Sequence, residues 1–159
     1  MSDGPTGVDG DLKLDAYLPY RLSVASNAVS GLIARAYQDR FALSIPQWRV
    51  ICVLAEDGDL TQGQIVARTM MDKVMVSRAA QGLLKRHLVE RSDHEVDGRS
   101  HVLALTPEGA GLHAEIAPLA LAYEAALIAG LAPDEVALLK RLLSRLQSAA
   151  GQLSGDAAP

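Results

Sequence analysis

Two helix-start signals follow each other closely in the middle of the chain, at Thr61 and Asp72. A threonine hydroxyl can cap a helix while a following glutamine, here Gln64, reaches back to the cap, and an aspartate can cap the next helix with its carboxylate. These signals predict short helices over 61–69 and 72–88 that are joined by a tight turn. Such an arrangement is typical of a helix-turn-helix.

A hairpin pattern follows the second helix, in a chain that otherwise reads as helix. Residues 88–92 can form one strand, and residues 101–105 alternate between two faces as a second strand. Between them, Asp97 and Gly98 both tolerate the positive φ of a tight turn. The pattern therefore predicts a small two-stranded wing directly after the helix-turn-helix.

Long helices are expected on both sides of this core. Apolar residues recur at steps of three and four over 19–41, and Ser44 begins another helix with a second capping-box pattern. Beyond the hairpin, one helix is expected to start after the cap Thr106 and to end near residue 130. The last helix starts at Pro133, and its leucines have the spacing of a helix–helix seam.

The predicted fold class is therefore mainly α. A winged helix-turn-helix core with a two-stranded β wing is expected over 44–106, flanked by long N- and C-terminal helices within 12–41 and 107–152. A chain of 159 residues, 49% of them hydrophobic, can bury one ordinary core, so we expect a single domain over 1–159.

Cysteine content and hydropathy indicate the compartment. Cys52 is the only cysteine, so no disulfide can form within the chain, and a reducing environment fits. We find neither a charged-then-apolar leader nor an apolar run of membrane-spanning length. The expectation is a cytoplasmic protein with no membrane partner.

Positive charge is concentrated in the middle of an acidic chain. The net charge is −4, yet residues 61–91 contain six basic and two acidic side chains. A local basic surface on one face of a protein is the electrostatic footprint of a DNA-binding site. The charge distribution therefore favours nucleic acid as a partner of this segment.

The second helix of the helix-turn-helix has two different faces. Its apolar side is predicted to bury Val76, Ala79, Ala80 and Leu83. The opposite side carries hydrogen-bond donors and positive charge with no carboxylate: Lys73, Ser77, Arg78, Gln81 and Lys85. Val74 also points outward, where an apolar side chain gains nothing unless a group such as a thymine methyl covers it. DNA contact is the interpretation we favour, and a solvated helix face is the plain alternative.

These motifs together resemble the MarR family of bacterial transcriptional regulators, over roughly residues 14–150. Family members typically show V-S-R on the recognition helix, then L-V-x-R, then D-x-R in the wing and L-T-x-x-G after it. The corresponding residues here are Ile65 and Ala67 before the recognition helix, then Val76, Ser77 and Arg78, then Leu88, Val89 and Arg91, then Asp97 and Arg99, and finally Leu105, Thr106 and Gly109. One departure is His87, where a glycine commonly ends the recognition helix; histidine tolerates left-handed geometry better than most residues.

The resemblance implies a sequence-specific DNA-binding protein that is not an enzyme. It implies a homodimer in which the helices within 12–41 and 107–152 interlock, a recognition helix in the major groove and a wing beside the minor groove. A repressor on a pseudo-palindromic operator is the expected role. The residues expected to contact DNA are Thr61, Gln62, Lys73, Val74, Ser77, Arg78, Gln81, Lys85, Arg91, Asp97 and Arg99.

The family resemblance also implies a small-molecule effector that weakens DNA binding. A pocket is expected where the first, second and fifth helices meet, lined by Tyr20, Arg21, Ser26, Asn27, Arg49 and His113. The arginines would suit an anionic ligand such as an aromatic carboxylate or its CoA thioester. Arg21 and Arg49 are alternatively ordinary surface ion-pair partners.

Other functions are weighed against this one. A winged helix that only mediates protein association would carry an apolar stripe where 73–85 is polar. A redox-responsive regulator would use Cys52, but its helical position next to apolar residues predicts an inert, buried thiol. A metal site could be built from Asp93, His94, Glu95, Asp97 and His101, yet no pair has helical ligand spacing and a polar wing is the simpler interpretation. No catalytic motif is present, and neither a cofactor nor a metal is expected.

Overall fold

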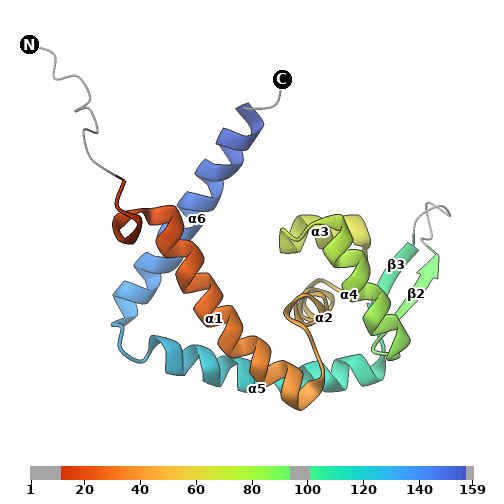
Figure 1. The fold of residues 1–159 in the computed structure, drawn as a ribbon. Helices are drawn as coiled ribbons and strands as arrows, with labels where there is room; N and C mark the ends of the chain where they lie inside the picture. The colour runs from red at the N-terminus through yellow and green to blue at the C-terminus, as the bar shows by residue number, and fades with distance from the viewer. Residues whose placement is uncertain (1–11, 94–100, 157–159) are drawn as a thin grey trace, which may run out of the picture. The chain divides into compact units, whose positions relative to one another are not determined.

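The computed structural model describes residues 12–93 and 101–156 (Figure 1). Its contacts divide the chain into two compact units, residues 1–113 and residues 114–159. The helices of the chain, in order, are η1 (Leu14–Ala16), α1 (Leu18–Phe41), α2 (Ile45–Asp57), α3 (Gln62–Thr69), α4 (Lys73–Lys85), α5 (Pro107–Ile128) and α6 (Pro133–Asp156), and the strands are β1 (Leu60–Thr61), β2 (Val89–Asp93) and β3 (His101–Leu105). The mainly α fold with a winged helix-turn-helix is confirmed, whereas the single domain over 1–159 stays a prediction.

The predicted helix starts are confirmed by their capping bonds. Ser44 Oγ accepts a hydrogen bond from the Gln47 backbone N–H at 3.3 Å, and Gln47 Oε1 accepts one from the Ser44 N–H at 3.0 Å. Thr61 and Gln64 form the same reciprocal pair at 3.2 and 2.8 Å. Each pair satisfies two amide groups that the first turn of a helix leaves without partners. Local sequence therefore sets where α2 and α3 begin.

Helix α4 ends at Lys85, so the predicted end at 88 was wrong. His87 adopts a left-handed conformation with φ of 56°, and its N–H donates to the Leu84 carbonyl at 3.1 Å. Leu88 N–H then donates to the Leu83 carbonyl at 3.0 Å. These bonds close the helix in the way a glycine usually does. The histidine thus fulfils the structural role of the glycine it replaces.

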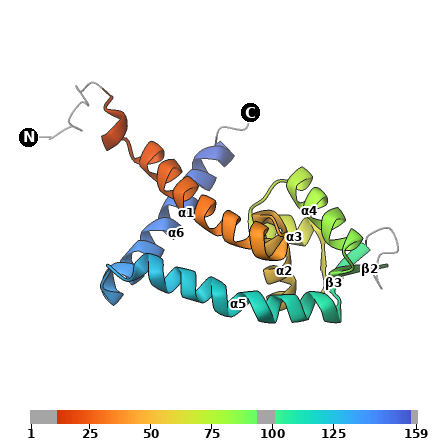
Figure 2. The same ribbon diagram turned by 60° about the horizontal axis from the view of Figure 1, so that its bottom comes forward.

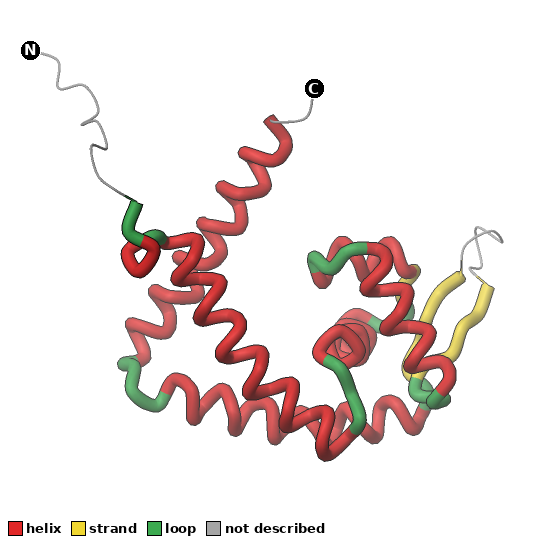
Figure 3. The backbone as a smooth tube through the Cα atoms, viewed as in Figure 1, coloured by secondary structure: helices red, strands yellow, loops and turns green. Residues whose placement is uncertain are grey.

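The predicted two-stranded wing is confirmed as β2 and β3, and a short strand that we did not predict, β1, extends it to a three-stranded sheet. β2 and β3 pair antiparallel with Val89 opposite Leu105, and β1 pairs with the other edge of β3 with Leu60 opposite Leu103. β1 has only two residues and one of them, Thr61, also caps α3, so it carries no alternating pattern that a sequence reading could detect. Figure 3 shows the strands confined to the region beside α4.

The core of the first unit lies between α2, α3, α4 and the small sheet. These elements lie next to one another in both Figure 1 and Figure 2. The predicted inner face of α4 is buried, and Ile51 of α2, Ile65 of α3 and Leu103 of β3 are at most 1% exposed around it. Burial of this apolar side fixes which side of α4 remains outside.

The position of Gly109 shows why the L-T-x-x-G motif ends in a glycine. Gly109 lies in the first turn of α5, where Thr106 Oγ1 caps it by accepting a hydrogen bond from its N–H at 3.0 Å. A Cβ at this position would collide with the backbone carbonyl of Leu88, and it would lie 3.2 Å from Cδ2 of Leu105. The start of α5 therefore approaches the start of β2 more closely than any side chain permits.

In the second unit, α6 carries a line of leucines that remain partly exposed. Leu138, Leu139, Leu142, Leu143 and Leu146 are 39–45% exposed. Lys140 forms an ion pair with Glu124 of α5 at 3.4 Å, and Glu135 accepts a hydrogen bond from the Ala132 N–H at 2.8 Å, which caps α6. Within the described residues, no single helix has both the length and the apolar composition needed to cross a membrane.

Candidate nucleic-acid interface

The exposed face of α4 gathers the side chains that the sequence predicted for it. Lys73, Val74, Arg78, Gln81 and Lys85 are exposed and Ser77 is half-buried. All of these except Lys85 line one shallow depression on the surface. Val74 is 60% exposed although it is apolar. The depression therefore combines hydrogen-bond donors and positive charge with an apolar contact, and no carboxylate lines it.

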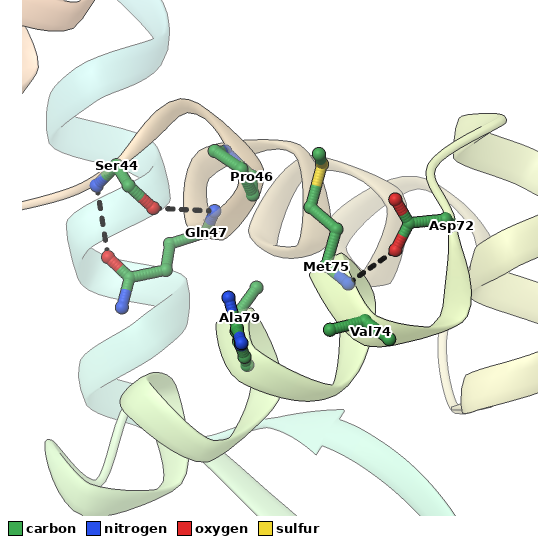
Figure 4. Close-up of a pocket in the computed structure, with 8 residues that line it drawn as sticks. Ser44, Pro46, Gln47, Asp72, Val74, Met75 and Ala79 are labelled. Atoms are coloured by element: carbon green, nitrogen blue, oxygen red, sulfur yellow. Dashed lines mark hydrogen bonds between the residues drawn. The ribbon is translucent and has the colours of Figure 1, made fainter.

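A second pocket lies where the N-terminal end of α4 meets the start of α2 (Figure 4). Its lining residues are Ser44, Pro46, Gln47, Asp72, Val74, Met75, Arg78 and Ala79. Figure 4 shows that three of its polar side chains form capping bonds: Ser44 and Gln47 with each other's backbone N–H, and Asp72 with the Met75 N–H at 2.7 Å. Because Gly82 has no side chain, the Gln47 amide can lie directly against α4. Val74 and Arg78 line both this pocket and the depression on the exposed face of α4.

A third depression lies between the start of α3 and the wing. Thr61, Gln62, Gly63, Arg91, His101 and Leu103 line this depression. The Thr61 hydroxyl accepts the bond that caps α3 and donates to Gln64 Oε1 at 3.1 Å, so its one O–H donor is used within the fold. Gln62 and Arg91 are exposed. The structure thus brings Gln62 and Arg91, which are distant in sequence, to one edge of the helix-turn-helix.

A cross-strand pair joins the last residue of β2 to the first residue of β3. Nδ1 of His101 on β3 lies 3.0 Å from Oδ1 of Asp93 on β2, and the two residues are register partners. The predicted wing contacts Asp97 and Arg99 lie outside the described residues, as do His94 and Glu95, so three of the five candidate metal ligands fall outside them. Within 12–93 and 101–156, no three histidine, cysteine or acidic side chains gather in a way that could hold a metal.

Two arginines that the sequence reading did not select have defined partners. Arg68 of α3 contacts Glu56 at 2.7 Å and Asp57 at 3.0 Å, which joins α3 to the end of α2. The sequence offered a signal for these ion pairs, because the basic Arg68 lies in the helix that follows the acidic end of α2. Arg86 donates to the backbone carbonyls of Phe41 and Ala42. No local pattern reveals that contact, because its partners are 44 and 45 residues away.

The residues predicted for an effector pocket lie on three helices. Tyr20, Arg21, Ser26 and Asn27 are exposed on α1 and Arg49 is exposed on α2. His113 of α5 stacks on Trp48 with ring centroids 5.5 Å apart, and Trp48 in turn meets the edge of Tyr37 at 5.5 Å. None of the six lines the three depressions described above. Their role in effector binding stays a prediction.

Cys52 is half-buried in α2. Burial raises the pKa of its thiol to about 12, and the negative charge of Glu56 adds to this rise. A thiol with so high a pKa carries very little thiolate at neutral pH, and thiolate is the form that oxidants attack. The environment of Cys52 therefore does not favour a redox-sensing role.

Comparisons with known proteins agree with this geometry. The model of the MarR family matches residues 43–100, the segment from the start of α2 to the wing. A comparison with curated protein sequences finds no match.

Three solved structures resemble the chain over most of its length. The MarR/EmrR family transcriptional regulator from Acinetobacter sp. ADP1 is 25% identical, with a TM-score of 0.82 and coverage of 89% of this chain and 99% of that one. BpsR from Bordetella bronchiseptica is 25% identical, with a TM-score of 0.81 and coverage of 87% and 98%. A probable transcriptional regulator from Pseudomonas aeruginosa is 28% identical, with a TM-score of 0.78 and coverage of 84% and 99%. The chain therefore has the winged helix-turn-helix fold of these regulators, and its segment 43–100 is similar to the MarR family, as its motifs indicate.

Proposed function

We propose that this protein is a homodimeric repressor that holds a pseudo-palindromic operator through α4 and that a small aromatic acid releases it. The observation that carries the DNA-binding part is the exposed face of α4, where Lys73, Ser77, Arg78 and Gln81 surround one depression without a carboxylate. An α-helix fits the major groove, where such donors meet base edges and phosphates. A module for protein association alone would place apolar side chains on this face.

Different parts of the surface contribute different contacts in this proposal. Gln81 can read adenine through two hydrogen bonds, whereas Lys85, at the end of α4, meets phosphate. Gln62 and Arg91 flank the helix and contact the backbone of the duplex. Two further residues of the proposed interface, Asp97 and Arg99, are assigned from the sequence motif alone. In this proposal Arg99 enters the minor groove and Asp97 orients the wing tip.

Dimerisation is supported by apolar surface on each of the two units. In α1 of the first unit, Leu18, Leu22, Val24, Val29 and Leu32 are 37–52% exposed. The leucines of α6 form a comparable surface in the second unit. Burial of such side chains against a second copy of the chain stabilises a dimer, since each fully buried leucine contributes about 1.5–3 kcal/mol.

The effector part of the proposal is supported by a relative. DNA binding by BpsR is regulated by 6-hydroxynicotinic acid, which is an aromatic carboxylate. In this chain, Arg21 and Arg49 provide guanidinium groups that suit the same chemistry, with Tyr20, Ser26, Asn27 and His113 as further lining. An aromatic carboxylate or its CoA thioester is therefore the ligand class to test first.

The experiment begins with selection of duplexes from random DNA by the purified full-length protein, followed by fluorescence anisotropy on the selected sequence. Gln81→Ala should relax the preference at one or two base pairs, and Lys85→Ala should weaken binding to all sequences alike. Arg141→Ala, which removes an exposed arginine from α6, is the matched control and should bind as the wild type does. Failure of the wild type to enrich any sequence would refute the DNA-reading role.

Repression and release are tested separately. A reporter gene placed behind the selected operator should fall in expression when the protein is present, and a panel of aromatic carboxylates should restore it. Increased expression in the presence of the protein would identify an activator. If none of the aromatic carboxylates changes the anisotropy of the protein–operator complex, this ligand class is excluded.

A further inference from the structure

The C-terminal end of the recognition helix is bonded to two other segments of the first unit. On one side, Arg86 donates from Nη1 to the Ala42 carbonyl at 2.8 Å and from Nη2 to the Phe41 carbonyl at 3.0 Å. On the other side, Thr106 Oγ1 donates to the His87 carbonyl at 2.7 Å, and the Thr106 N–H donates to the Leu88 carbonyl at 3.2 Å. The end of α4 is therefore held between the end of α1 and the start of α5.

The contact of Arg86 with α1 has a favourable chemistry. Phe41 is the last residue of α1 and Ala42 is its C-cap, so their carbonyls belong to the negative end of the helix dipole. A guanidinium offers two parallel N–H donors with a full positive charge, which matches two successive carbonyls. One side chain thus satisfies two groups that α1 itself leaves without helical partners.

The point on α1 to which Arg86 is bonded is itself well fixed. Ala42 is in the left-handed region with φ of 50°, and its N–H donates to the Gln38 carbonyl at 3.0 Å. Leu43 follows with no exposed surface, and its N–H donates to the Tyr37 carbonyl at 3.3 Å. Arg86 therefore connects α4 to an anchored turn rather than to a loose chain end.

We infer that Arg86 is a positioning residue that sets the angle of the recognition helix from the end of α1. The inference rests on the proposed DNA-binding function, because its consequence is measured on the operator. Capping of α4 by Asp72 holds only the N-terminal end of the helix, and Thr106 holds the C-terminal end from the side of α5. Without Arg86 the bond to α1 is lost, so a displacement of α1 is no longer passed to α4 through this contact.

An exposed arginine near the end of a recognition helix has another possible role, which is direct contact with phosphate. The two roles differ in a measurable way. Loss of a phosphate contact weakens binding to every duplex and makes the dependence of affinity on salt shallower by about 0.9 in log–log slope. Loss of positioning weakens binding to the operator alone, because base readout needs the correct helix angle and nonspecific attraction does not.

The test compares Arg86→Met and Arg86→Lys with Lys85→Met as the matched neighbouring control, all in the full-length protein. Anisotropy is recorded with the selected operator and with a scrambled duplex over a series of salt concentrations. Arg86→Met should bind the operator roughly tenfold more weakly, consistent with lost charge-assisted hydrogen bonds, and should bind the scrambled duplex as the wild type does. Arg86→Lys should recover part of the loss. Lys85→Met should weaken both duplexes and lower the salt slope.

Hydrogen exchange of the free protein supplies a second measurement that requires no DNA. Arg86→Met should accelerate amide exchange at Ala42 and Leu43 and at His87 and Leu88, with no change in α6, whereas Lys85→Met should leave both sites unchanged. Unchanged exchange in Arg86→Met, or equal weakening on both duplexes with a shallower slope, would overturn the inference. If the wild type selects no operator, the proposed function fails, and hydrogen exchange still decides whether Arg86 joins α1 to α4.

Discussion

Val74 is the one apolar side chain among the residues that line the depression on α4. It is 60% exposed, so most of its apolar surface stays in water in the free protein. Its neighbours Lys73 and Ser77 can bond to DNA, while a branched hydrocarbon can only cover another apolar group. Thymine alone offers a methyl group in the major groove, so we propose that Val74 contacts it.

We predict that replacing the contacted thymine of the operator by uracil weakens binding by the wild type. The loss of one buried methyl corresponds to roughly 0.8 kcal/mol, or about fourfold in affinity. Val74→Ala should bind both duplexes with nearly equal affinity. Anisotropy with the four combinations of protein and duplex measures this, and a uracil effect that persists in Val74→Ala would assign the methyl contact to another residue.

Cys52 should remain insensitive to oxidants in the native protein. Because burial raises the pKa of its thiol to about 12, the thiolate that reacts with peroxide or iodoacetamide is scarce at neutral pH. We expect unchanged operator affinity after treatment with mild peroxide and slow alkylation that accelerates as the pH rises. Mass spectrometry of the treated protein monitors both, and rapid modification at neutral pH would show that the thiol is activated.

The junction between β2 and α5 depends on a close approach of two backbones. Gly109→Ala should destabilise the protein by about 1–3 kcal/mol, because the new Cβ meets the Leu88 carbonyl and the backbones must separate. Gly111→Ala, two residues later in the same helix with nothing within 4 Å of its Cβ, is the matched control. It should stabilise by roughly 0.5–1 kcal/mol through higher helix propensity. Chemical denaturation gives the change in unfolding free energy for both variants. A change of the same sign in both would contradict the role assigned to Gly109.

The assembly of the protein is decided by surfaces that a single copy leaves exposed. Leu143 lies in the partly exposed line of leucines on α6, whereas Ser144, its neighbour, is also exposed but polar. We expect Leu143→Asp to convert a dimer into a monomer at micromolar concentration and to abolish tight operator binding, since two half-sites must be engaged together. Ser144→Asp should remain dimeric. Light scattering distinguishes the species, and a monomeric wild type would end the dimer proposal.

Interactions between near neighbours account for what could be predicted without the structure. The capping boxes at Ser44 and Thr61, the apolar side of α4 and the cap at Thr106 all depend on residues within one or two helical turns. Such signals act before any tertiary contact exists, so they can be read in order along the chain. They were sufficient to predict the helix order, the wing and the exposed face of α4.

Contacts between distant residues were decided only by the tertiary structure. β1 exists because Leu60 and Thr61 meet β3, and Gly109 is required because α5 begins against Leu88. Arg86 reaches carbonyls that lie 44 and 45 residues before it. The partners in these contacts are backbone groups, which every residue possesses. The sequence by itself determined the elements and the chemistry of the exposed α4 face, while tertiary packing determined which backbone atoms hold that face in position.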